Sequence, residues 1–84
     1  MSYFRDKVVL VTGSSSGLGR VIARGFADAG AKIVIVGLEP GDVERVTAEM
    51  KATGCDALGL TANVTDQADV ENLFARTLAH FGRL

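Results

Sequence analysis

Eight residues near the N-terminus combine glycine and serine in a spacing suited to binding a phosphate group. Residues 12–19 are Thr-Gly-Ser-Ser-Ser-Gly-Leu-Gly, between an apolar run at residues 8–11 and an amphipathic stretch that begins at Leu18. A turn of this composition directs backbone N–H groups at a pyrophosphate, and the N-terminus of the following helix adds a partial positive charge. We therefore expect a dinucleotide-binding turn here.

Each glycine of this turn has its own physical task. Gly13 lets the chain turn sharply off a strand, Gly17 leaves room where backbone meets phosphate, and Gly19 permits close packing of helix on strand. The spacing G-x-x-x-G-x-G differs from the common G-x-G-x-x-G fingerprint, and the Gly-Lys-Ser/Thr of a P-loop is missing. An ordinary loop is the alternative, and the flanking strand and helix patterns argue against it.

The spacing of apolar residues predicts the elements that position this turn. Residues 8–11 form an apolar, mostly β-branched run, as expected of a strand buried on both faces of a parallel sheet. A helix is predicted over residues 18–29, with apolar positions at helical spacing and Gly30 as its stop. Gly25 inside this helix indicates a close approach of another backbone. Residues 33–36 are a second buried strand.

The second half of the chain continues the alternation. Residues 39–42, with Pro40 in the first turn, open a helix that Gly54 ends, and residues 57–62 predict a third, shorter strand. Thr65 is the expected N-cap of a last helix. The predicted buried face of that helix consists of Val70, Leu73, Phe74, Leu78 and Phe81.

The order βαβαβα predicts the α/β class, as the N-terminal portion of a doubly wound parallel sheet of Rossmann type. Residues 1–84 would form one partial domain of this kind. Right-handed crossovers put the first two helices on one face of the sheet. We expect the third helix to cross to the other face only if a fourth strand follows beside the first. Because the chain stops before such a strand, we expect a segment of a longer protein.

Composition excludes several function classes. The chain is 48% hydrophobic and 23% charged with a net charge of −1, and its scattered Lys and Arg offer no footprint for nucleic acid or an anionic membrane. Its apolar runs are too short to cross a bilayer, and its charged N-terminal residues do not match a signal peptide. A single cysteine, Cys55, excludes an internal disulfide and favours a reducing, cytoplasmic location.

Residues 12–19 resemble the T-G-x-x-x-G-x-G cofactor motif of the short-chain dehydrogenase/reductase family. The resemblance implies an NAD(P)-dependent oxidoreductase that transfers a hydride between an alcohol/ketone pair and a nicotinamide, and that forms a homo-oligomer when full length. This chain would supply the dinucleotide-binding part. The residues that the resemblance places at the pyrophosphate and ribose are Gly13, Ser15, Ser16, Gly17, Leu18 and Gly19.

The resemblance places a second cofactor contact at the end of the second strand. In the family, an acidic residue at the position of Gly37 accepts the adenosine ribose hydroxyls and favours NAD. A basic residue at the position of Leu38 or Ser16 pairs with the 2′-phosphate of NADP. This sequence has neither. Glu39 would oppose a 2′-phosphate or reach the ribose, or it only favours the start of the next helix. We expect NAD, with NADP as the alternative.

A third contact is implied at residues 63–65, Asn-Val-Thr, which resemble the Asp-Val-Thr segment that holds the adenine edge in the family. Asn63 departs from the usual Asp; its amide still donates and accepts hydrogen bonds but carries no charge. Capping of the loop before the last helix is the alternative role for Asn63. We expect Asn63 and Val64 to contribute to cofactor binding.

We expect no catalytic residue in this chain and no activity from it alone, because the family's catalytic Tyr and Lys lie beyond residue 84. Tyr3 and Lys7 share the Tyr-x-x-x-Lys spacing, but extended chain would separate them by about 13 Å, so we interpret the match as coincidence. His80 lacks a partner at metal-ligand spacing, and no metal site is predicted. The alternatives are a non-catalytic nucleotide-binding or truncated module, and a turn that binds FAD.

Overall fold

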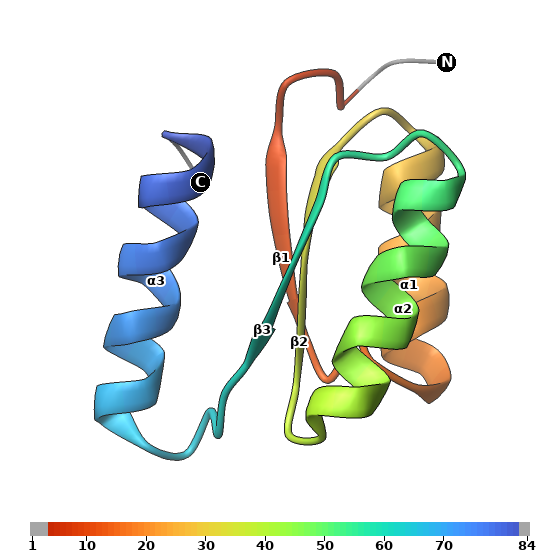
Figure 1. Cartoon of the computed structure of the whole chain (residues 1–84). Helices are drawn as coiled ribbons and strands as arrows, with labels where there is room; N and C mark the ends of the chain where they lie inside the picture. The colour runs from red at the N-terminus through yellow and green to blue at the C-terminus, as the bar shows by residue number, and fades with distance from the viewer. Residues whose placement is uncertain (1–3, 83–84) are drawn as a thin grey trace.

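Three apolar strands form a parallel sheet, and the amphipathic helices that alternate with them along the chain cover both of its faces (Figure 1). The computed structural model describes residues 4–82. This is the βαβαβα order that the sequence predicts. The strands are β1 (Val8–Thr12), β2 (Lys32–Gly37) and β3 (Ala57–Thr61), and the helices are α1 (Gly17–Asp28), α2 (Pro40–Ala52) and α3 (Gln67–Phe81).

The middle strand of the sheet is β2, which pairs in parallel with both β1 and β3. Thr12 lies opposite Val36, and Gly37 lies opposite Thr61, so the carboxyl ends of all three strands reach the same edge. Residues 33–36 of β2 are buried, as predicted, and Gly37 is buried as well. Strand β1 lies at the edge of this sheet, so the predicted burial of residues 8–11 holds only for Val8, which is 8% exposed, while residues 9–11 are half-buried.

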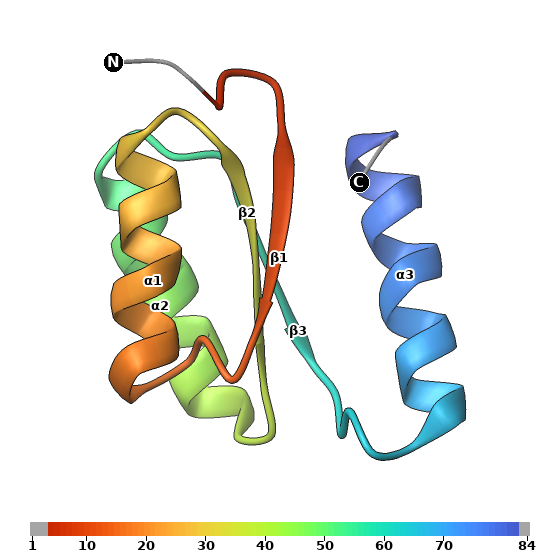
Figure 2. The same ribbon diagram turned by 180° about the vertical axis from the view of Figure 1, so that it is seen from behind.

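Helices α1 and α2 lie together on one face of the sheet, and α3 lies on the other (Figure 1 and Figure 2). Ile33 and Ile35 of β2 contribute to the core beneath α1 and α2, whereas Val34 and Val36 contribute to a second core with Leu73 of α3. The pleat of a strand sends successive side chains to opposite faces in this way. Helix α3 covers this second apolar face, which is where the sequence places it for a chain that continues into a fourth strand.

Helix α3 buries a narrower stripe than predicted. Leu73 is 3% exposed and Thr77 is fully buried, whereas Phe74 and Leu78, both predicted to be buried, are 42% and 49% exposed. The helical spacing is right, but a sheet of three strands covers only part of an amphipathic face.

Helix α1 shows the same narrowing of its buried face. Ala23 is fully buried, while Leu18 is 74% and Ile22 is 42% exposed. Apart from the backbone of α1 itself, no described atom lies within 4 Å of the place that a Cβ of Gly25 would occupy, so the predicted close approach of another backbone is not found among residues 4–82. No helix in the described part of the chain combines the length and apolar character that crossing a membrane requires.

The N-cap of α3 is Asp66, one residue beyond the predicted Thr65. The carboxylate of Asp66 accepts hydrogen bonds from the backbone N–H groups of Ala68 (2.9 Å) and Asp69 (3.2 Å). An N-cap of this kind satisfies donors that have no partner within the helix. Capping therefore stabilises the first turn of α3.

Replacing Asp66 with Ala should lower the free energy of unfolding by about 1 kcal/mol, because two N–H groups of α3 lose their acceptor. Urea denaturation measures this difference. Glu44→Ala, which removes an exposed carboxylate from α2, is the matched control and should change stability by less than about 0.5 kcal/mol. Equal stabilities of the two variants would contradict the capping role.

Candidate dinucleotide-binding site

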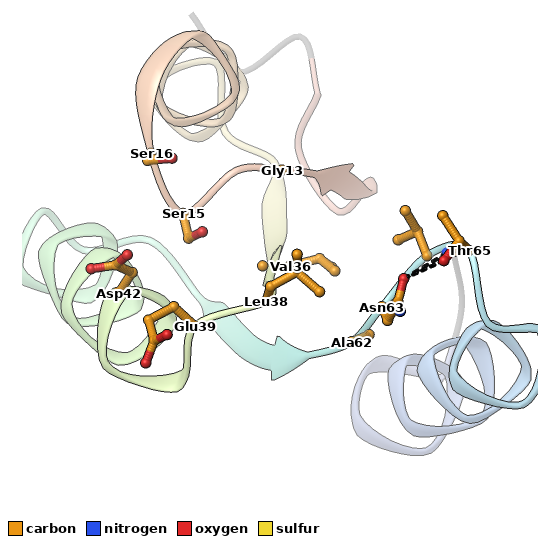
Figure 3. A pocket seen from close by; sticks show the side chains of 12 residues that line it. Gly13, Ser15, Ser16, Val36, Leu38, Glu39, Asp42, Ala62, Asn63 and Thr65 are labelled. Carbon is orange, nitrogen blue, oxygen red and sulfur yellow. Dashed lines mark hydrogen bonds between the residues drawn. The ribbon is translucent and has the colours of Figure 1, made fainter.

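The carboxyl ends of the three strands border a pocket of about 400 Å³ (Figure 3). Open α/β sheets bind their ligands at this edge. Gly17, Leu18 and Gly19, which were also predicted to bind the cofactor, lie in the first turn of α1 and do not line the pocket. The predicted residues that do line it are Gly13, Ser15, Ser16, Gly37, Leu38, Asn63 and Val64.

The turn after β1 is tied to β2 through Ser14. Its backbone N–H donates to the carbonyl oxygen of Val36 (3.0 Å), and the N–H of Val36 donates to Ser14 Oγ (2.9 Å). Ser14 is fully buried. These two hydrogen bonds join the turn to β2 two residues beyond the end of β1, and they fix the point where the turn begins. Sequence reasoning missed this role, since nothing in the local pattern distinguishes Ser14 from its two neighbouring serines.

Two glycines give the turn its shape, and a third lets α1 approach it. Gly13 and Gly17 have φ values of 67° and 55°, a region that residues with a Cβ rarely adopt. A Cβ on Gly19 would collide with the carbonyl oxygen of Gly13 and lie 3.1 Å from the Cα of Ser14. Close packing was predicted at Gly19; its partner is the backbone of the turn.

The N-terminus of α1 is open to an anion. Ser16 is the N-cap, but its side chain makes no capping hydrogen bond, and the first turn holds no acidic residue. The N–H groups of that turn are therefore not satisfied by a side-chain cap, in contrast to those of α3, which Asp66 caps. Unsatisfied N–H groups at a helix N-terminus attract phosphate oxygens.

The side of the pocket next to β2 and α2 carries negative charge. Glu39 and Asp42 both line it, and no Lys or Arg is found among its lining residues. Glu39 is the N-cap of α2, yet its carboxylate makes no capping hydrogen bond. Asp42 pairs with exposed Arg45 at 2.9 Å. Figure 3 shows Ser15, Glu39 and Asp42 on one side of the pocket and Asn63 on the other. Sequence reasoning missed Asp42, which the first turn of α2 brings to the pocket.

Asn63 organises the loop between β3 and α3. Its Oδ1 accepts hydrogen bonds from Thr65 N (3.0 Å) and Thr65 Oγ1 (2.6 Å), and its own N–H donates to Asp69 Oδ2 (2.8 Å). The loop-capping alternative for Asn63 thus matches the structure. Because Oδ1 is engaged, the side-chain amide N–H groups are what Asn63 can offer to a ligand.

The other reactive side chains lie away from this pocket. Burial raises the pKa of the Cys55 thiol, which therefore stays protonated at neutral pH, and its Sγ lies 3.5 Å from the carbonyl oxygen of Ala31. His80 is exposed and packs edge-on against Phe81. Residues 4–82 contain no group of three His, Cys, Asp or Glu side chains that could hold a metal ion. Tyr3 lies outside the described residues.

The family model for short chain dehydrogenases matches residues 7–84. The chain belongs to the short-chain dehydrogenase family. It is 45% identical over 78 residues to a 2,5-dichloro-2,5-cyclohexadiene-1,4-diol dehydrogenase of Sphingobium indicum, covering 93% of this chain and 31% of that protein. It is 36% identical over 84 residues to a CLA biosynthesis dehydrogenase/reductase of Lactiplantibacillus plantarum, covering 100% of this chain and 29% of that protein.

Solved structures of the same family share the fold of this chain. A short-chain dehydrogenase/reductase from Burkholderia phymatum, in complex with NAD, superposes with a TM-score of 0.93 at 32% identity, over 100% of this chain and 30% of that one. A citronellol catabolism dehydrogenase of Pseudomonas aeruginosa gives a TM-score of 0.91 at 30% identity, over 96% of this chain and 34% of that one. These matches confirm the predicted family and the predicted Rossmann-type fold. The chain spans about 30% of the length of these relatives.

Two glycines of α1 should respond in opposite ways to replacement by Ala. Gly19→Ala should lower the free energy of unfolding by about 1–3 kcal/mol, because the new methyl group meets the backbone of the turn. Gly25→Ala should raise it by about 0.5–1 kcal/mol, since the space is open and Ala favours a helix. Thermal unfolding of both variants compares them directly. If both stabilise the protein, the close packing at Gly19 is refuted.

Proposed function

We propose that this short-chain dehydrogenase chain is the dinucleotide-binding part of an NAD(P)-dependent oxidoreductase acting on an alcohol/ketone pair. The supporting observation is a pocket at the carboxyl ends of three parallel strands, next to a helix N-terminus that no side chain caps. A neighbour of the same fold holds NAD, and the named relatives are dehydrogenases or reductases. The nicotinamide would supply the hydride chemistry.

The residues of the chain would bind and orient the dinucleotide in three places. The turn from Gly13 to Gly19 would hold the pyrophosphate through backbone N–H groups and the dipole of α1. Gly37 and Leu38 would border the adenosine ribose. Asn63 and Val64 would border the adenine, with the Asn63 amide as a donor. No residue of this chain would take part in proton transfer.

We propose NAD as the cofactor, with NADP as the alternative. A 2′-phosphate at the end of β2 would lie near Glu39 and Asp42 without a Lys or Arg among the lining residues. Each charge-assisted hydrogen bond that such a phosphate lacks is worth about 1.5–3 kcal/mol. The ribose of NAD carries no phosphate at this position, so it is not repelled by the carboxylates of Glu39 and Asp42.

We further propose that the whole protein works in the cytoplasm as a homo-oligomer. A reducing compartment suits a single cysteine whose pKa is raised by burial, so that the thiol persists. The homo-oligomer follows from the family resemblance.

Leu38→Arg should shift the cofactor preference of the full-length protein toward NADP by about tenfold or more, because the guanidinium can pair with the 2′-phosphate. Leu38 is 71% exposed, so the fold should tolerate the change. Titration of NAD and NADP by calorimetry, with Leu38→Gln as the neutral control, measures the shift. Tighter binding of NADP than of NAD by the unmodified protein would refute the proposal of NAD.

Turnover should require residues that this chain does not contain. The purified 84-residue chain, mixed with NAD or NADP and a panel of secondary alcohols, should give no change in absorbance of the reduced nicotinamide above background. The full-length protein should oxidise at least one member of the panel. A full-length protein that binds the dinucleotide and never turns over would favour a non-catalytic binding module instead.

A further inference from the structure

The side chain of Ser15 fills the space that a side chain at position 37 would need. Ser15 is 7% exposed. A Cβ on Gly37 would collide with Ser15 Oγ and lie 2.8 Å from Ser15 Cβ, and on its other side Val43 Cγ2 would be 3.2 Å away. Position 37 is therefore closed by the turn after β1 and by α2.

Ser15 has little freedom to move out of this space. Its neighbour Ser14 is held by the two hydrogen bonds to Val36, and Val36 directly precedes Gly37. The two hydrogen bonds between Ser14 and Val36 thus also keep the side chain of Ser15 next to the Cα of Gly37. Replacing Gly37 alone would force the joined segments apart.

The lack of space at position 37 matters because the end of β2 is where dinucleotide-binding sheets hold the adenosine ribose. An acidic side chain about 20 residues beyond the glycine-rich turn commonly accepts the ribose 2′-hydroxyl. Ser15 prevents such a side chain at position 37. Both residues line the pocket, and the Ser15 hydroxyl forms no hydrogen bond with another described residue, so it is available to a ligand.

We propose that Ser15 is a specificity-determining residue because its bulk excludes a carboxylate from position 37. Its hydroxyl, which the family resemblance places at the ribose, would then be the neutral contact that remains there. This inference rests on the proposed function. A hydroxyl is neutral and both donates and accepts hydrogen bonds. A hydroxyl therefore discriminates between NAD and NADP less strongly than a carboxylate does. Glu39 and Asp42 would provide the rest of the preference for NAD, because their negative charge disfavours the 2′-phosphate.

The packing half of the proposal is tested without any cofactor. In the full-length protein, Gly37→Asp should lower the thermal midpoint by about 5 °C or more, because the new side chain meets Ser15 and Val43. Adding Ser15→Gly to the same protein should restore most of the loss. A Gly37→Asp variant as stable as the parent, or a double variant no more stable than Gly37→Asp, would overturn the packing argument.

The ribose half is tested by binding. Ser15→Ala keeps most of the packing, so it should weaken the binding of NAD about three- to tenfold and leave the thermal midpoint unchanged. The control is Thr61→Ala, which changes an exposed residue outside the pocket and should bind NAD like the parent. The double variant Gly37→Asp/Ser15→Gly should favour NAD over NADP about tenfold more strongly than the parent does.

Two further results separate the failure of this inference from that of the proposed function. Unchanged NAD affinity in Ser15→Ala, with a parent that binds NAD, would overturn the role of the hydroxyl. A parent that binds neither dinucleotide would overturn the proposed function and the ribose contact together, and the thermal midpoints would still decide the packing between Ser15 and Gly37.

Discussion

The parallel pairing of β1 with β2, closed by the two hydrogen bonds between Ser14 and Val36, is the constraint on which the site depends. Parallel strands need a crossover, and α1 provides it. The crossover has to begin where β1 ends, so the glycine-rich turn and the N-terminus of α1 reach the same edge as the end of β2. A slip of one residue in this register would move every side chain of β1 to the other face.

The proposed site would combine positive potential at the glycine-rich turn with negative charge at the start of α2. At the turn, backbone N–H groups and the dipole of α1 offer positive potential without any cationic side chain. At the start of α2, Glu39 and Asp42 contribute negative charge to the same pocket, and the ion pair with Arg45 offsets part of the charge of Asp42. A diphosphate would thus be favoured in one part of the pocket and a further phosphate disfavoured in the other.

The packing of serine and glycine residues shows why the turn could be predicted and its internal contacts could not. The phosphate-binding geometry follows from glycines close together in the sequence, and the positive φ values of Gly13 and Gly17 agree with that prediction. The close approach of Ser15 to Gly37 joins the turn after β1 to the end of β2. No local pattern indicates which of three consecutive serines points to the neighbouring strand.

The sequence by itself determined the element types, their order and the place of the turn, because apolar periodicity and glycine backbone freedom act over a few residues. The tertiary structure alone decided which part of each amphipathic face is buried. Phe74 and Leu78 match the helical period as well as Leu73 does, yet only Leu73 is covered. The physical reason is that burial depends on the width and neighbours of the sheet, which arise only when distant segments meet.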